Sequence, residues 1–169
     1  EGIGRGRLLV DSLVGITCTG IGCHDLYDLR NEVAPEQCLD IATRLEMIDS
    51  TFEPIEDILY RDRVWTQHTQ GWLAHLVQHL EAVSEESLWS SDSFYISDRR
   101  NHAILRLLQL EYALRAWKAE HQQWPDSLEA MVPVIIPAVP IDPFSPEEKP
   151  LQYIRTAKGY VLYSVGQNG

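Results

Sequence analysis

Hydrophobic residues recur at the spacing of an α-helix over most of the first half of the chain. Apolar side chains three and four positions apart predict one helix over residues 5–30 and a second over residues 34–49. Pro35 in the first turn, followed by Glu36, is typical of a helix start. A third helix is predicted over residues 54–83. The first half of the chain is therefore expected to form a bundle of three helices.

The pattern changes over residues 84–98, where polar residues with scattered aromatic side chains indicate a loop. A fourth helix is predicted after this loop by apolar positions that step by three and four, namely Leu107, Leu110, Leu114 and Trp117. Asp98 is suited to cap the start of this helix, and Pro125 is expected to end it.

The end of the chain reads as a short helix, a proline-rich loop and a hairpin. The short helix is predicted over residues 127–132, and five prolines between residues 133 and 146 exclude long helices and central strands there. Residues 151–155 and 160–164 alternate as strands. We expect Gly159 to supply a positive φ in the turn between them.

Together these elements predict an α+β fold. A mostly helical region, residues 1–97, would precede a long helix that carries a small antiparallel sheet, residues 98–169. The chain has 169 residues, of which 44% are hydrophobic and 23% charged. This composition is ordinary for a globular protein with a sizeable core.

The charge of the chain limits its partners. There are 14 basic and 25 acidic side chains, which give a formal net charge of −11. Nucleic acids and anionic lipid surfaces are polyanions, so we expect neither as the main partner. The three cysteines, an odd number, argue against a disulfide framework and are expected on buried helix faces.

No stretch of the sequence is long and apolar enough to span a membrane. The chain begins with Glu1 in the middle of a pattern and without an initiating methionine. We therefore expect a piece of a longer protein, in which any membrane attachment comes from a segment before Glu1.

The last third contains an ordered set of motifs. Residues 114–125 read Leu-Arg-Ala-Trp-Lys-Ala-Glu-His-Gln-Gln-Trp-Pro, residues 127–133 read Ser-Leu-Glu-Ala-Met-Val-Pro, and residues 140–144 read Pro-Ile-Asp-Pro-Phe. Leu-Gln-Tyr-Ile at 151–154 and Gly-Tyr-Val-Leu-Tyr-Ser-Val-Gly at 159–166 follow. In this order the motifs resemble the C-terminal module of type II secretion pseudopilins, of the G type in particular. The N-terminal helical region carries no such resemblance.

The resemblance implies a small sheet packed on a helix, in a non-catalytic structural or interaction module of a bacterial envelope protein. It implies protein partners and a position on the periplasmic side. The family's cleavage motif and long hydrophobic helix are not visible, and the chain ends in Gly166-Gln-Asn-Gly169 without the acids of the family's calcium loop. Asp142, held between prolines, is the best calcium candidate in this sequence.

A different class of function is suggested by histidines in the predicted third helix. His75 and His79 are four residues apart, which allows two imidazoles to chelate one divalent metal in a metal-dependent enzyme or metal-binding domain. Leu76 stands where zinc hydrolases of the zincin type carry their glutamate base. The alternative is that His68, Trp72 and both of these histidines form a helix interface.

A third class is a helical domain that binds a small ligand, in a closed apolar cavity among the first three helices. No motif pairs a nucleophile with an activating base, so the chain is not expected to be an enzyme. The sequence does not specify an oligomeric state.

Overall fold

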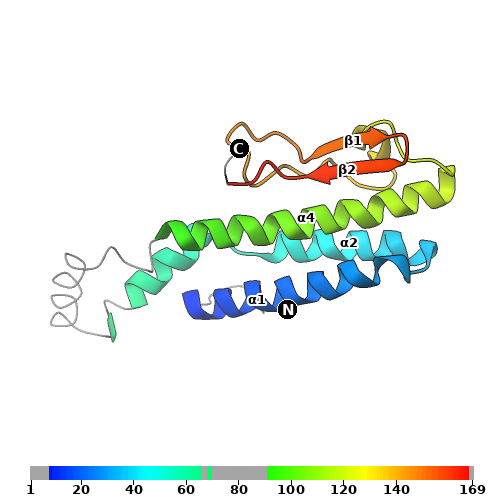
Figure 1. Ribbon diagram of the computed structural model, residues 1–169. Helices are drawn as coiled ribbons and strands as arrows, with labels where there is room; N and C mark the ends of the chain where they lie inside the picture. Colours follow the sequence, from blue (N-terminus) through cyan, green and yellow to red (C-terminus); the bar gives the residue numbers. More distant parts are fainter. Residues whose placement is uncertain (1–7, 66–67, 70–90, 168–169) are drawn as a thin grey trace. The chain divides into compact units, whose positions relative to one another are not determined.

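The computed structural model describes residues 8–65, 68–69 and 91–167 (Figure 1). It confirms the α+β class, with long helices followed by a two-stranded antiparallel sheet. The elements in chain order are α1 (Leu9–Asp28), η1 (Leu29–Asn31), α2 (Pro35–Thr51), α4 (Ser91–His121), η2 (Leu128–Met131), β1 (Gln152–Thr156) and β2 (Gly159–Tyr163). No helix in these described ranges is both long and apolar enough to cross a bilayer.

The chain divides into two compact units that each combine distant segments of the sequence. The first unit comprises Glu1–Cys18 and Phe52–Asp98, and the second comprises Thr19–Thr51 and Arg99–Gly169. The predicted domain boundary between residues 97 and 98 stays a prediction. The second unit contains α2 as well as the C-terminal part of the chain, and so combines segments from both predicted regions.

The first unit has a small core on residues 55–65, which are helical as predicted. Ile55, Ile58 and Phe94 are buried together, and Leu9 packs against them. The backbone N–H of Leu9 also donates to Asp62 Oδ1 at 3.3 Å. The predicted continuation of this helix lies mostly outside the described residues.

The predicted loop before the fourth helix is wrong over residues 91–98. Helix α4 begins at Ser91, so Asp98 lies within the helix and does not cap it. The physical reason is burial of Phe94 against Ile55 and Ile58, which stabilises helix in a stretch of polar composition.

The second unit is organised around the remainder of α4. Its side chains are buried on more than one face, because residues 19–28 of α1 and the helix α2 pack on one side and the hairpin on the other (Figure 1). Leu110, Tyr112, Ala113 and Leu114 are fully buried. The Tyr112 hydroxyl donates to the carbonyl of Leu26 at 2.7 Å, which ties the end of α1 to α4.

Helix α4 stops before the predicted Trp-Pro signal. Gln122 adopts a left-handed conformation (φ 61°), and its N–H donates to the carbonyl of Lys118 at 2.8 Å. This is a common way for a helix to end. Residues 128–131 then form a 3₁₀-helix in place of the short helix predicted over residues 127–132.

The hairpin has the predicted strands, each displaced by one residue. Pairing runs from Gln152 opposite Tyr163 to Thr156 opposite Gly159, which leaves a two-residue loop. The expected positive φ at Gly159 is wrong, since this residue belongs to the ladder and needs an extended backbone. The described glycine with positive φ is Gly166.

Candidate binding groove

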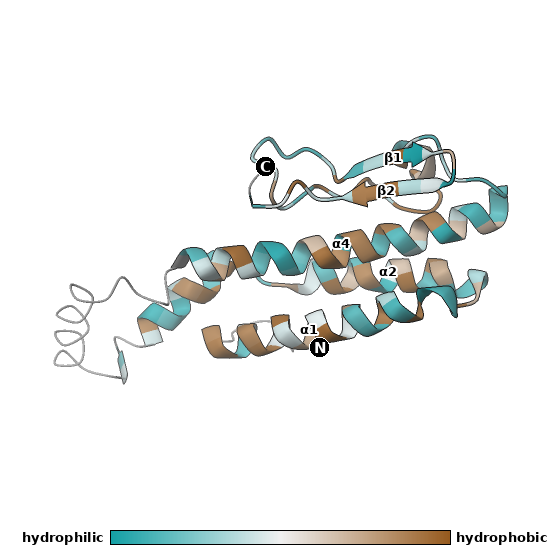
Figure 2. Ribbon diagram, viewed as in Figure 1, coloured by the Kyte–Doolittle hydropathy of each residue, from teal (hydrophilic) through white to brown (hydrophobic). Residues whose placement is uncertain are grey.

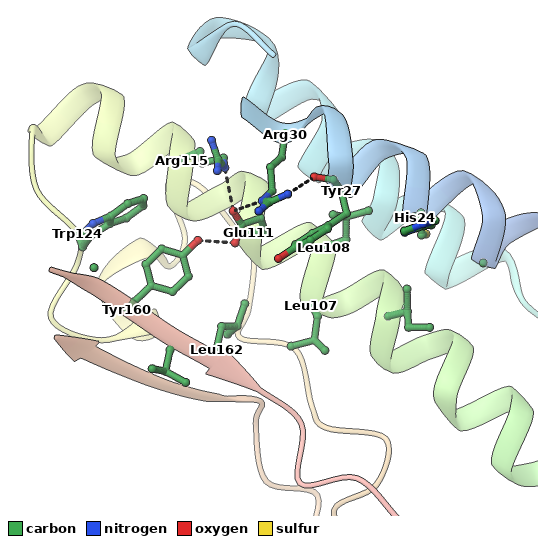
Figure 3. Close-up of a pocket in the computed structure, with 15 residues that line it drawn as sticks. His24, Tyr27, Arg30, Leu107, Leu108, Glu111, Arg115, Trp124, Tyr160 and Leu162 are labelled. Carbon is green, nitrogen blue, oxygen red and sulfur yellow. Dashed lines mark hydrogen bonds and ion pairs between the residues drawn. The ribbon is translucent and has the colours of Figure 1, made fainter. Parts of the chain in front are cut away.

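An open groove of about 790 Å³ lies within the second unit, between the end of α1, the middle of α4 and the strand β2 (Figure 3). Most of its lining is apolar, and a group of charged side chains stands at one end. The residues that define it here are Gly20, Cys23, His24, Tyr27, Arg30, Ile104, Leu107, Leu108, Glu111, Arg115, Trp124 and Gly159 to Leu162.

Glu111 is the centre of the charged end. Its Oε1 accepts a hydrogen bond from Arg115 Nε at 2.9 Å and lies 3.9 Å from Arg30 Nε. Its other oxygen accepts from the Tyr160 hydroxyl (Figure 3). Helix α4 positions Glu111 and Arg115 one turn apart, α1 leads into Arg30, and β2 supplies Tyr160. The hairpin is thereby fastened to the helices through one carboxylate.

This cluster has a surplus of positive charge, because two guanidinium groups share one carboxylate. Arg30 Nη1 also donates to the carbonyl of Tyr27 at 2.7 Å, and Arg115 Nη2 donates to Asn31 Oδ1 at 3.0 Å. A guanidinium has five N–H donors, so both arginines retain donors beyond these contacts. Each arginine side chain is 25% exposed. The charged end of the groove is therefore suited to an added carboxylate or another anion.

Two titratable groups of the groove, Tyr160 and Cys23, keep their protons at neutral pH. Burial raises the pKa of Tyr160 strongly, and its hydrogen bond to Glu111 raises that pKa further. The phenol consequently stays a proton donor to Glu111 at neutral pH. Burial also raises the pKa of the Cys23 thiol, which keeps it protonated and weakly nucleophilic.

Asp142, the predicted calcium candidate, is buried outside the groove in the proline-rich loop. Its Oδ1 accepts from Phe144 N at 2.9 Å and Ser164 Oγ at 2.7 Å, and its Oδ2 accepts from Val165 N at 2.7 Å. Its backbone N–H donates to the carbonyl of Lys149 at 2.9 Å. Through these hydrogen bonds, Asp142 joins the proline-rich loop to the residues that follow β2. Among the described ranges, no three potential ligands of the Asp, Glu, His and Cys types form a metal group.

His75 and His79, the other predicted metal ligands, lie outside the described residues. His68 is helical and exposed. The metal hypothesis for this stretch stays a hypothesis.

A second polar cluster was not predicted from the sequence. Asp49 on α2 contacts His102 Nδ1 at 2.6 Å and Arg106 Nε at 2.8 Å on α4. Burial alone would raise the pKa of Asp49, but the hydrogen bonds from these two residues lower it overall. Arg106 also donates to the carbonyl of Ile141 at 2.8 Å. The cluster therefore joins α2, α4 and the proline-rich loop.

The groove residues had weak signals in the sequence. The spacing of Glu111 and Arg115 is that of a helical ion pair, which is common on solvated faces. Tyr160 was expected as the first residue of the strand predicted over residues 160–164. Arg30 was expected only as the last residue of a helix.

No known protein-family model matches the chain, and neither a curated protein nor a solved structure gives a match.

Proposed function

We propose that this chain is a non-catalytic recognition module of a bacterial envelope protein, which holds a protein partner in the groove between α1, α4 and β2. The observation that carries the proposal is the combination of an open, largely apolar groove with two partly exposed arginines at one end. A mostly apolar lining with a few placed polar groups is typical of binding sites. Ile104 and Val161 are among the exposed large hydrophobic residues at this groove.

The envelope part of the proposal rests on the pseudopilin resemblance. A long helix, a short 3₁₀ segment, a proline-rich loop and a closing hairpin follow one another in the order that the resemblance implies. The hairpin lies along α4 (Figure 1). This agreement supports a pseudopilin-like module, joined to helices that contribute one wall of the groove.

Site-directed photo-crosslinking in native cells tests the proposal. Val161 lines the groove and is 48% exposed, and Val134 in the proline-rich loop is 73% exposed and is not among the groove residues. A photoreactive residue at position 161 of the full-length gene product should give a protein adduct of defined mass, and one at position 134 should not.

The fractionation of these cells separates the two parts of the proposal. The adduct is expected in the periplasmic or membrane fraction. Equal labelling from positions 134 and 161, or none from position 161, would overturn the groove as a recognition site. An adduct confined to the cytosol would overturn the envelope assignment alone.

A small amphipathic acid is the second candidate occupant, favoured by the groove volume. About 790 Å³ lies within the range of about 300–1,000 Å³ of small-molecule sites. A medium-chain fatty acid should then protect the chain from thermal unfolding, and its methyl ester should not. Absence of protection by the free acid would remove this candidate.

A further inference from the structure

We propose that the occupant of the groove is an extended segment of a partner protein, which adds a strand to the outer edge of β2 and sets a carboxylate against Arg30 and Arg115. This inference rests on the proposed function and specifies the chemistry of its partner.

The outer edge of β2 is available for pairing. In an antiparallel pair, alternate residues direct their N–H and C=O groups away from the neighbouring strand. β2 pairs only with β1 in the described sheet, and none of the described residues hydrogen-bonds to its outer backbone groups. Such an edge is a template for an added strand.

The sequence of β2 lacks the features that proteins use to protect an edge. It reads Gly-Tyr-Val-Leu-Tyr, without charge or proline, whereas β1 contains Arg155 (Figure 2). Charged side chains and prolines on an edge prevent unwanted pairing. The unprotected edge is therefore the one on the groove side.

The groove has the shape that an added strand requires. The four consecutive residues Gly159 to Leu162 line it, and successive side chains of a strand point to opposite faces. The backbone of β2, rather than one face of the sheet, therefore borders the groove. An added strand would lie roughly 4.8 Å from β2, over α4. On the α1 wall, Gly20 has open space where a Cβ would be, which leaves room for a backbone.

The charges fix which part of the segment goes where. Tyr160, Arg30 and Arg115 gather around Glu111 at one end, and Leu107 and Leu162 lie toward the other (Figure 3). An acidic group opposite Tyr160 would meet the surplus guanidinium charge, where charge-assisted bonds are strongest. Apolar side chains would follow toward Leu162.

Selection from a displayed library of random peptides on the immobilised chain tests the predicted chemistry. Peptides with an acidic residue beside alternating apolar residues should be enriched. Arg115→Gln and Arg30→Gln should each weaken a selected peptide about tenfold, the equivalent of about 1.4 kcal/mol. Arg100→Gln is the matched control, since Arg100 is exposed on α4, lies outside the groove and carries the same charge. No enrichment of acidic peptides, or equal loss in all three variants, would overturn the inference.

An ester scan of the selected peptide tests strand addition without any change to the protein. Replacing one amide by an ester removes an N–H donor with little change in size. Esters at alternate positions should weaken binding about fivefold, because their N–H groups would pair with β2, and those between should have little effect. Equal effects at all positions would show that no strand is added. The position of the carboxylate is identified by comparing a free C-terminus with an amidated one.

The outcomes separate this inference from the proposed function. A partner adduct from position 161 combined with a flat ester scan leaves the recognition module standing and removes strand addition. If the chain forms a dimer that the selected peptide does not dissociate, and position 161 crosslinks to a second copy, the occupant is the chain itself and the inference is wrong.

Discussion

Two carboxylates, those of Asp142 and Glu111, bind the C-terminal hairpin and the residues after it to the rest of the second unit, and their surroundings differ. Asp142 is 1% exposed and accepts three hydrogen bonds from two backbone N–H groups and one hydroxyl. The Glu111 side chain is 14% exposed and contacts two guanidinium groups and one phenol. The first carboxylate is satisfied by neutral groups. The second has more cationic donors around it than it can use.

This difference separates a carboxylate that stabilises the fold from one that lies at the proposed binding site. The donors to Asp142 are fixed by the chain around it, so an added ligand would have to displace them. At the groove, the arginines retain N–H donors, and a second carboxylate would accept hydrogen bonds from them. Surplus donors beside an apolar groove therefore point to a binding site more directly than burial of a charge does.

Asp142→Asn should give the largest loss of stability. The amide nitrogen of asparagine cannot accept the bonds that one carboxylate oxygen receives, so at least one buried N–H or O–H loses its partner. We expect the free energy of unfolding to fall by about 3 kcal/mol. Denaturant unfolding followed by circular dichroism measures this. Ser164→Ala, which removes one donor and keeps the carboxylate, is the control and should cost about 1 kcal/mol. Equal stability of Asp142→Asn and the parent would show that the hydrogen bonds to the Asp142 carboxylate do not stabilise the fold.

Glu111→Gln should have two effects of opposite sign. The loss of the carboxylate weakens the bonds to Arg115 and Tyr160 and should lower the free energy of unfolding by about 1–2 kcal/mol. The same change frees both guanidinium groups, so acidic peptides selected on the parent should bind several-fold more tightly. Unfolding and fluorescence anisotropy measure the two effects. Weaker binding would show that Glu111 itself contacts the ligand. The two arginines would then not be the groups that recognise the acid.

Rising pH should lower the free energy of unfolding through Tyr160. Burial and the bond to Glu111 raise the pKa of Tyr160 in the folded chain above its ordinary value of 10.0. Unfolding at alkaline pH then releases a proton, so this contribution to stability is complete below about pH 10 and declines above it. Tyr160→Phe should cost about 1 kcal/mol at neutral pH and should flatten the alkaline decline. The same decline in both proteins would assign it to other groups whose pKa burial raises, which among the described residues include Tyr112, Tyr153, Cys23 and Cys38.

Asp126→Asn should have the smallest effect and serves as an external reference. Asp126 pairs with Arg155, but its side chain is 92% exposed. Exposed ion pairs contribute little because water and salt screen them. The midpoint of denaturant unfolding should stay within experimental error of the parent. A loss of unfolding free energy comparable to that of Glu111→Gln would show that exposure of a carboxylate does not determine how much it stabilises the fold.

Local signals in the sequence were sufficient for most of the elements. Pro35 marks the first residue of α2, and the apolar steps from Leu107 to Trp117 lie within α4 as predicted. The alternation around Tyr153 and Tyr160 located the hairpin to within one residue. The start of α4 was missed because polar residues dominate there, and helix depends on burial of Phe94 by a distant segment.

The sequence by itself determined the class of fold and the order of the elements, because these follow from the periodicity of neighbouring residues. On the predicted apolar face of α4, Leu110 and Leu114 are buried, whereas Leu107 and Trp117 are only partly buried. Only the tertiary structure decided what the charged residues do. It placed Asp142 among backbone donors, and it brought Arg30, Glu111 and Tyr160 together from two helical segments and a strand. Contacts between residues far apart in the chain depend on how the elements pack, and a single sequence has no local pattern for them.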